Sequence, residues 1–273
     1  MLKGKKLGIL GLGKIGEALV TGLIRKGVVA AADLAGSVKR EESLKRVAER
    51  LGISASTDSA AVVAQSDIVV IATKPQAVEG LLAVIDPAVR AGQIVISIAA
   101  SVPTSFIETR LGLPVSVIRA MPNTPCTLGA GMTVLSPGKH ASPADLALAV
   151  EIFDAVGRTA ILDERLMDGV TGLSGSGPAY IYVVIEALSE AGVKLGIPRE
   201  TSLLLASQTV YGAARMVLEM GEHPALLKDV VTTPAGCTID GLLELEEGKL
   251  RVTLVKAVVK AAERAKELVR ESR

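Results

Sequence analysis

The chain has 273 residues, of which 49% are hydrophobic and 22% are charged, and its 30 basic and 29 acidic side chains leave a formal net charge of +1. This length is enough for two domains with substantial cores, and the high apolar content excludes a disordered chain. A dedicated nucleic-acid binder needs a basic surface and stacking aromatic rings. The chain offers neither, because it has no basic excess and only three Tyr, two Phe and no Trp.

The uncharged stretches of the chain, such as Ala91–Ile107 and Gly169–Ile185, contain Pro, Ser and Gly at intervals. A membrane-spanning helix needs roughly 20 mostly apolar residues in a row, so we predict no membrane span. The basic N-terminus runs into a strand-like segment and has no cleavage site of a secretory signal. The two distant thiols, Cys126 and Cys237, are predicted to be reduced and buried. These features indicate a cytoplasmic protein.

Short apolar runs alternate with helical segments through the first part of the chain. A strand, a glycine turn and a helix that ends at Gly27 come first, and a charged helix is predicted over Glu41–Leu51. Because the apolar runs are continuous, they indicate a parallel sheet with helices on both faces. We therefore predict a doubly wound α/β domain over residues 1–163. Its predicted strands are Leu7–Leu10, Leu34–Val38, Asp67–Ala72, Gln93–Ile98 and Val115–Ala120.

Strand-like runs disappear after Asp163, and residues 164–273 are predicted to form an all-helical domain. The helices carry more apolar side chains than one layer can cover, including Leu203, Leu204 and Met216, and a monomer rarely exposes so much apolar surface. We expect an obligate dimer. The predicted helices cover Tyr180–Ala191, Arg199–Met220, Pro224–Val231, a segment around Ile239–Leu243, and Leu250–Arg270.

The motif Gly11-x-Gly13-x-x-Gly16 follows the first strand and opens a helix. Glycines at this spacing let the backbone turn and approach a pyrophosphate, which the N-terminus of the helix attracts. The motif therefore predicts dinucleotide binding. The alternative is an ordinary glycine-rich turn. Lys14, inside the turn, is predicted to be solvated and not catalytic.

The end of the second strand distinguishes the two nicotinamide dinucleotides. An NAD site places an acidic residue there, but Asp33 precedes the strand instead of ending it. Ser37, Lys39 and Arg40 stand at the end, and a hydroxyl with two cations suits the additional 2′-phosphate of NADP(H). The alternative is a solvated pair of charges at the start of the next helix.

Polar residues also follow two later strands, at Thr73-Lys74-Pro75 and at Asn123-Thr124. Ligands bind at the carboxyl ends of parallel strands in this architecture, and the prolines around Asn123 stiffen its loop, which suits a wall of a nicotinamide site. The alternative is a plain connecting loop. Two glycine-serine turns, Gly172–Tyr180 and Val230–Thr238, offer amides and hydroxyls that could bind a carboxylate or could simply cap helices.

Several motifs of other chemistries are missing, namely H-E-x-x-H, C-x-x-C and G-x-S-x-G. We therefore predict no metal site. A hydroxyacid dehydrogenase needs a strong acid or base for the alcohol proton. A protonated cyclic imine is already electrophilic, so the available hydroxyl groups favour hydride delivery to a C=N bond.

Five segments match motifs of a known family in the right order: Gly11–Gly16, Ala72–Gln76, Arg119–Pro125, Gly172–Tyr180 and Val231–Leu243. The chain resembles the pyrroline-5-carboxylate reductases over essentially its whole length. The resemblance implies a Rossmann-like domain, a helical domain that builds an interlocked dimer, and assembly of dimers into a decamer. It also implies NADPH-dependent reduction of 1-pyrroline-5-carboxylate to L-proline, the last step of proline biosynthesis.

The resemblance also assigns residues by position, and Thr238 and Lys74 are the implied catalytic residues. It further implies that the enzyme uses NAD(H) more weakly than NADP(H). Thr238 is expected to hydrogen-bond the imine nitrogen or ring region, and backbone amides to hold the carboxylate. The implied cofactor-binding residues are Gly11, Gly13, Lys14, Ile15, Gly16, Ser37, Lys39, Arg40, Ser59, Ala72, Thr73, Lys74, Pro75, Ala99 and Asn123. The implied substrate-binding residues are Ser174, Gly175, Ser176, Gly177, Pro178, Thr232, Thr233, Gly236, Cys237 and Thr238.

Two positions depart from the family pattern, and both concern cofactor discrimination. Thr73 replaces the usual Val before Lys74, and Ser59 stands where some members carry an Asn. Three alternatives remain at this point: a reductase related to the β-hydroxyacid dehydrogenases, an imine reductase with another substrate, and an NADP-sensing module without turnover.

Overall fold

The computed structural model describes residues 2–271, which fall into two compact units. The first unit comprises the residues up to Gly175 together with those from Lys260 onward, and the second is Ser176–Val259. The change in composition near Asp163 predicts a boundary at residues 163 and 164. The compact units divide between Gly175 and Ser176, and the last part of the C-terminal helix, from Lys260, belongs to the first unit.

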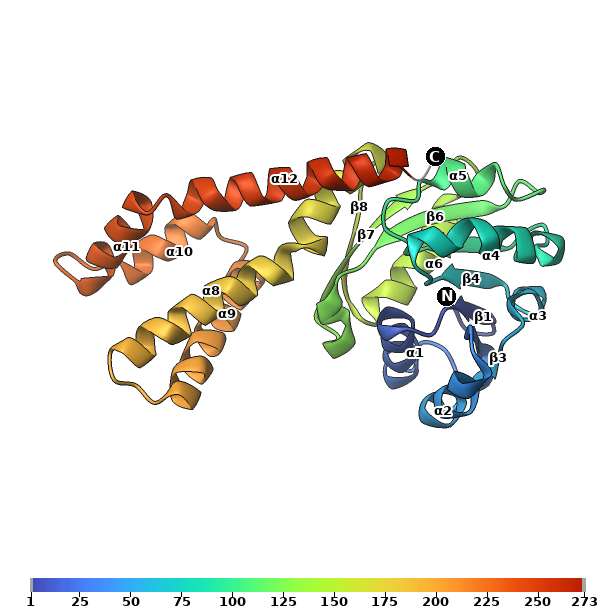
Figure 1. Ribbon diagram of the computed structural model, residues 1–273, viewed down its shortest axis with the longest axis horizontal. Coiled ribbons are helices and arrows are strands. Elements are labelled where there is room, and N and C mark those ends of the chain that lie inside the picture. Colours follow the sequence, from blue (N-terminus) through green and yellow to red (C-terminus); the bar gives the residue numbers. More distant parts are fainter. Residues whose placement is uncertain (1, 272–273) are drawn as a thin grey trace. The chain divides into compact units, whose positions relative to one another are not determined.

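The first unit contains one eight-stranded sheet with the strand order β3-β2-β1-β4-β5-β6-β7-β8 (Figure 1). All neighbouring strands run parallel except β6 and β7, which are antiparallel. The strand order reverses direction between β1 and β4, which is where ligands bind in open α/β sheets. The strands are β1 (Leu7–Leu10), β2 (Leu34–Ser37), β3 (Ser54–Ser56), β4 (Ile68–Ile71), β5 (Ile94–Ser97), β6 (Ser116–Met121), β7 (Gly131–Pro137) and β8 (Gly157–Ile161).

Six helices cover the two faces of the sheet (Figure 1). Helices α1 (Lys14–Arg25), α2 (Glu41–Leu51) and α6 (Pro143–Asp154) pack against one face, in a core that includes Ile9, Leu19 and Phe153. Helices α3 (Ser59–Ala64), α4 (Val78–Ile85) and α5 (Thr104–Glu108) pack against the other, in a core that includes Val69 and Leu82. Alternate residues of each strand therefore enter opposite cores, and this explains the continuous apolar runs.

The predicted doubly wound domain and its five strands are confirmed within one or two residues at each end. Three strands were not predicted. β3 consists of Ser-Ala-Ser and has no apolar run, whereas β7 and β8 extend the sheet beyond β6. β7 runs antiparallel to β6 because the chain returns alongside β6 after a short 3₁₀ helix, Thr124–Leu128.

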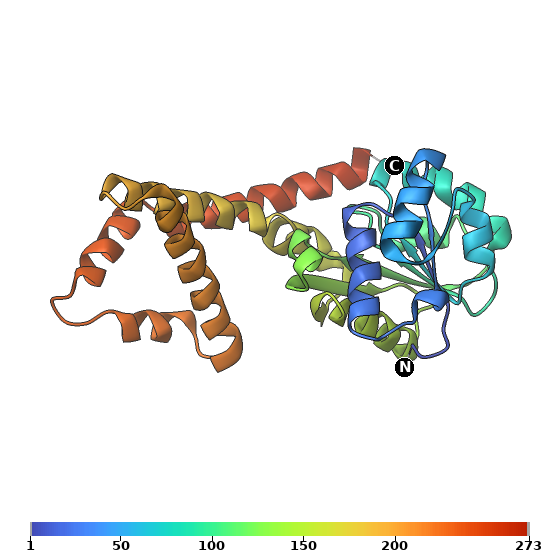
Figure 2. The same ribbon diagram turned by 90° about the horizontal axis from the view of Figure 1, so that it is seen from below.

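The second unit consists of helices, and its predicted elements are also confirmed. Helices α8 and α9 pack against each other, whereas α10 and α11 make only sparse contacts with the other described helices (Figure 2). The helices are α8 (Gly177–Lys194), α9 (Arg199–Met220), α10 (Pro224–Val231), α11 (Cys237–Glu247) and α12 (Leu250–Glu271), the last of which extends into the first unit.

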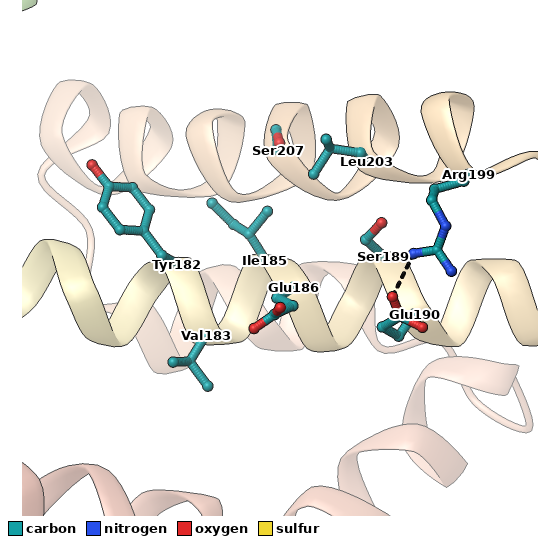
Figure 3. Close-up of a pocket in the computed structure, with 9 residues that line it drawn as sticks. All are labelled: Tyr182, Val183, Ile185, Glu186, Ser189, Glu190, Arg199, Leu203 and Ser207. Carbon is teal, nitrogen blue, oxygen red and sulfur yellow. Dashed lines mark hydrogen bonds and ion pairs between the residues drawn. The ribbon is translucent and has the colours of Figure 1, made fainter.

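The second unit has almost no interior of its own. Ala206 is the only buried apolar residue described between Ser176 and Val259, and the buried polar residues there are Ser189 and Ser202. An open, mostly apolar groove of about 630 Å³ runs between α8 and α9 (Figure 3). Tyr182, Ile185 and Leu203 line this groove, and Arg199 pairs with Glu190 at one end. No helix among the described residues is both long and apolar enough to cross a bilayer.

Candidate functional site

The glycine motif lies between β1 and α1, and two of its three glycines, Gly11 and Gly16, are required for different steric reasons. Gly11 has a φ of +103°, and a Cβ there would lie 2.8 Å from the carbonyl oxygen of Ala72. A Cβ on Gly16 would collide with the carbonyl oxygen of Gly11. Gly13 faces open space, with no atom within 4 Å of the position of a Cβ. The first glycine therefore permits the turn, the third permits close packing of the helix, and the second leaves the backbone accessible to a ligand.

Helix α1 begins directly after this turn. Its N-cap is Gly13, and no side chain caps the helix. The first-turn amides, including those of Lys14 and Ile15, can therefore donate hydrogen bonds to a pyrophosphate. The Lys14 side chain is exposed.

The end of β2 combines a buried hydroxyl pair with exposed cations. The Oγ atoms of Ser37 and Ser59 are 2.9 Å apart, and Ser37 is 4% exposed. Since one of the two hydroxyls donates to the other, one hydroxyl hydrogen of the pair remains available. Lys39 and Arg40 follow and are exposed. Asp33 lies in the short turn before β2, as predicted.

A cavity of about 320 Å³ lies beside the glycine turn and the end of β2. Lys39 and Arg40 line it, together with Gly11 and Gly13. Two polar residues of α2, Ser43 and Arg46, also line this cavity, and no motif of the sequence singles them out. Their spacing of three residues on the helix was the available signal, because it places both on one face.

The ends of β4 and β5 lie next to the glycine turn in the sheet. The amide of Ala72 donates to the carbonyl of Leu10 at 2.8 Å. The Thr73 hydroxyl is buried and has no hydrogen-bond partner among residues 2–271. Lys74 is exposed, and Pro75 begins a short helical turn. Ala99, after β5, is buried, and its amide donates to the Ser97 hydroxyl at 3.3 Å.

Both polar atoms of the Asn123 side-chain amide form hydrogen bonds within the protein. Its Nδ2 donates to the carbonyl of Ser174 at 3.1 Å, and its Oδ1 accepts from the amide of Met132 at 2.8 Å. Met121 also contacts this region, because a Cβ on Gly175 would lie 2.7 Å from its Cε. Asn123 thus fixes the segment that ends at Gly175 to the sheet, where β6 ends and β7 begins.

A second tie holds the start of the same segment. Arg119 is 4% exposed, and its Nη1 lies 3.5 Å from Oε1 of Glu164. The amide and the hydroxyl of Thr104 donate to the same carboxylate at 2.8 and 2.7 Å. A buried charge needs such partners, because an unpaired one is costly. Residues 164–175 are therefore anchored to the sheet at both ends.

The segment predicted as the first glycine-serine turn is largely helical. Thr171–Gly175 forms a π-helical turn, in which the Ser174 hydroxyl donates to the carbonyl of Val170 at 3.2 Å. Ser176 separates it from α8, which begins at Gly177 and has Pro178 in its first turn. The prediction of proline at a helix start is confirmed, whereas the prediction of a turn before it is wrong. π-Helical turns are frequent at functional sites.

The second glycine-serine segment forms the turn before α11. Gly236 is the N-cap of this helix, and no side chain caps it. Thr238 is the second residue of α11, so the alternative that it caps the helix is excluded. Its hydroxyl forms no hydrogen bond with the described part of the chain. The Thr232 hydroxyl, in contrast, donates to the carbonyl of Lys228 at 2.8 Å.

Of the two cysteines predicted to be buried, only Cys126 is buried. Its burial raises the pKa of its thiol. Cys237 is exposed, at the first residue of α11 next to Thr238. Across the described residues, no three His, Cys, Asp or Glu side chains gather as a metal-binding group.

Comparisons with known proteins identify both parts of the chain. Residues 164–268 match a family model described as pyrroline-5-carboxylate reductase dimerisation. Residues 6–101 match a model described as NADP oxidoreductase, coenzyme F420-dependent. The exposed apolar helices and the first of these models agree that the C-terminal part is an oligomerisation domain.

Similar proteins cover nearly the whole chain. A pyrroline-5-carboxylate reductase of Methanosarcina acetivorans is 46% identical over 98% of this chain and 99% of its own length. The structure of a pyrroline-5-carboxylate reductase from Coxiella burnetii superimposes with a TM-score of 0.92 at 35% identity, covering 97% of this chain and 98% of that one. The structure of a Plasmodium falciparum pyrroline carboxylate reductase with NADP bound superimposes with a TM-score of 0.86 at 31% identity, and the match covers 97% of this chain and 98% of that one. This chain therefore belongs to the pyrroline-5-carboxylate reductase family.

Proposed function

We propose that this protein reduces 1-pyrroline-5-carboxylate to L-proline with NADPH. The observation that carries the proposal is the full-length match to reductases of this name, in a chain whose glycine turn has the geometry of a dinucleotide site. A hydroxyacid dehydrogenase or a non-catalytic sensor would share the first unit, but neither accounts for the match of residues 164–268.

The first unit contains groups that fit NADP(H). The open backbone at Gly13 and the uncapped start of α1 suit the pyrophosphate, and Lys39 and Arg40 suit the 2′-phosphate. The Ser37–Ser59 pair has one hydroxyl hydrogen for the same phosphate or its ribose. When bound, NADPH supplies a hydride to the imine carbon. The binding of NADP(H) is supported by the second family model and by the NADP-bound relative, and we propose that NAD(H) binds more weakly.

Other residues of the first unit are proposed to line the nicotinamide side, namely Ala72, Thr73, Lys74, Pro75 and Ala99. The unpartnered, buried hydroxyl of Thr73 supports a polar ligand here, since a buried hydroxyl without a hydrogen bond is costly. Lys74 is exposed at the end of β4, so its ammonium group can approach a ligand at this strand end. Asn123 supports this region through its bonds to Ser174 and Met132.

The substrate offers a ring nitrogen between the imine carbon and the carbon that carries the carboxylate. We propose that the uncapped amides at the start of α11, from Gly236 and Cys237 onward, bind the carboxylate. The Thr238 hydroxyl, which has no partner in the described chain, then contacts the nitrogen as the developing amine gains basicity. Thr232, Thr233 and the residues Ser174, Gly175, Ser176, Gly177 and Pro178 are proposed to complete the substrate contacts.

The assembly is proposed to be a homodimer, further organised as a decamer, in the cytoplasm. The dimer is supported by the second unit, whose helices bury only Ala206 among their apolar residues. Covering that surface with a second copy removes it from water, and this is the principal driving force of obligate association.

The test is an assay of NADPH oxidation, followed by the loss of absorbance of the reduced nicotinamide, with 1-pyrroline-5-carboxylate added. The expected result is turnover with stoichiometric formation of proline. Binding of NADPH without oxidation of the cofactor would overturn the proposal and favour the sensor.

A further inference from the structure

Besides the glycine turn itself, two segments line the cavity of about 320 Å³. The loop after β2 supplies Val38, Lys39 and Arg40, and α2 supplies Ser43, Arg46 and Val47. Ser43, Arg46 and Val47 lie three and four residues apart, so they share one face of the helix. Because the Val47 side chain is buried in the core, this face is fixed against the domain. Arg46 is therefore held at the cavity by the packing of its own helix.

The cations around this cavity have no counter-charge within the protein. Lys39, Arg40 and Arg46 form no ion pair or side-chain hydrogen bond in the part of the chain that the structure describes. Arg50, one turn further along the same helix, is paired with Glu17 instead. The acidic residues of the first turn of α2, Glu41 and Glu42, do not line the cavity.

Three unpaired cations around one concave surface imply an anionic ligand. A helix N-terminus adds to the field, because α2 begins at Glu41 and no side chain caps it. The chemistry of the set is that of a phosphate monoester site: guanidinium groups give forked hydrogen bonds, a lysine gives a point charge, and a serine donates a hydroxyl.

We propose that Arg46, together with Ser43, forms the helix side of the 2′-phosphate site and determines the preference for NADP(H) over NAD(H). The inference rests on the proposed use of NADPH, and it assigns discrimination to a residue that lies outside the loop after β2. A ribose with a free 2′-hydroxyl presents no charge to Arg46. Removing the guanidinium therefore weakens binding of the phosphorylated nucleotide and leaves the other nearly unchanged.

The experiment is calorimetric titration of the full-length protein with 2′,5′-ADP and with 5′-AMP, without substrate. The variant is Arg46→Gln, and the matched control is Lys45→Gln, which removes a neighbouring exposed cation of the same helix that does not line the cavity. A hydrogen bond to a charged group predicts about a 10- to 100-fold rise in the Kd of Arg46→Gln for 2′,5′-ADP. We expect its Kd for 5′-AMP, and both values for Lys45→Gln, to stay within about twofold of the parent. For a parallel Ser43→Ala variant we expect a smaller rise in the Kd for 2′,5′-ADP, because a neutral hydrogen-bond donor contributes less than a charged one.

Two outcomes overturn the inference: equal losses in Arg46→Gln and Lys45→Gln, or an Arg46→Gln loss that is as large for 5′-AMP as for 2′,5′-ADP. The proposed function has a separate failure. If the parent protein shows the expected 2′-phosphate selectivity but does not oxidise NADPH with 1-pyrroline-5-carboxylate, the proposed reaction is wrong, whereas the proposed 2′-phosphate site is retained.

Discussion

The two units of the chain place their apolar side chains differently. In the first unit, strands and helices enclose two large clusters, one on each face of the sheet, with members such as Phe153 and Leu82 at 0% exposure. In the second, Leu203, Leu204 and Tyr211 are all half exposed or more, and a single alanine is the buried apolar residue described. The first unit completes its core from one chain, whereas the second needs apolar surface from another chain.

The difference also separates two kinds of binding chemistry. The first unit offers a rigid backbone turn and fixed cations, which suit a cofactor with a constant shape. The second offers the start of α11 and a free hydroxyl, on helices that one chain alone supports poorly. Substitutions in the two units should therefore have different consequences, and four experiments test this expectation.

The largest expected effect is loss of assembly when charge is introduced into the second unit. Leu203→Glu combined with Leu204→Glu places two carboxylates on side chains that are 50% and 66% exposed in one chain. Burying a charge at an interface costs several kcal/mol, so we expect monomers in light scattering. The control is Val84→Glu with Leu113→Glu, at 56% and 42% exposure in the first unit, which should keep the parental mass. If both double variants keep the parental mass, the exposed face of α9 is not the interface.

The next effect concerns catalysis by the second unit. We expect kcat of Thr238→Ala to fall about 10²- to 10³-fold, the usual effect of removing one group that stabilises the transition state. Thr238→Ser, which keeps the hydroxyl, should retain much of the activity, and NADPH binding should stay unchanged in both variants. Since Gly236 and not Thr238 is the N-cap of α11, we expect little change in Tm. A parental kcat in Thr238→Ala would remove the residue from the site.

The corresponding change in the first unit should alter binding selectively. Replacing both Lys39 and Arg40 with Ala is expected to raise the KM for NADPH by at least about 10-fold, because each cation can contribute a charge-assisted hydrogen bond. The KM for NADH should change little. Equal increases with the two cofactors would show that these residues support the loop rather than the phosphate.

The smallest effect compares one thiol from each unit. The raised pKa of Cys126 lowers its thiolate fraction at a given pH, and the thiolate is the form that reacts. Cys237 is exposed, so an alkylating reagent should modify it first, and Cys126 should react only when the protein is unfolded. Peptide mass spectrometry after timed alkylation checks the order. Modification of Cys126 first in the folded protein would contradict the burial described here.

Much of this structure follows from local sequence patterns, and the remainder depends on contacts between distant residues. The apolar runs predict the central strands, and the glycine spacing predicts the turn before α1, because both signals lie within a few residues. β3 has no such signal, since Ser54–Ser56 is a strand only through its pairing with Ala35–Ser37. β7 forms the one antiparallel pair of the sheet, with β6. The short 3₁₀ helix Thr124–Leu128 between the two strands determines this pairing.

The same distinction applies to the candidate site. Lys39 and Arg40 were predicted because they directly follow a strand, whereas Arg46 is recognised only when α2 is placed against the glycine turn. The resemblance and the stiff loop place Asn123 near the cofactor. Its hydrogen bonds within the protein reach residues 9 and 51 positions away, and no pattern in the sequence reveals such partners.

Asn123 is the only asparagine in the chain, and its position has a consequence for the lifetime of the protein. Deamidation turns the amide into a carboxylate and replaces the Nδ2 donor with an oxygen. That oxygen would face the carbonyl of Ser174, so a stabilising hydrogen bond would become a repulsion between two acceptors. Asparagine is among the residues that heat damages most readily. Chemical ageing of this protein through asparagine therefore acts at one place, the hydrogen bond that joins the end of β6 to the segment ending at Gly175.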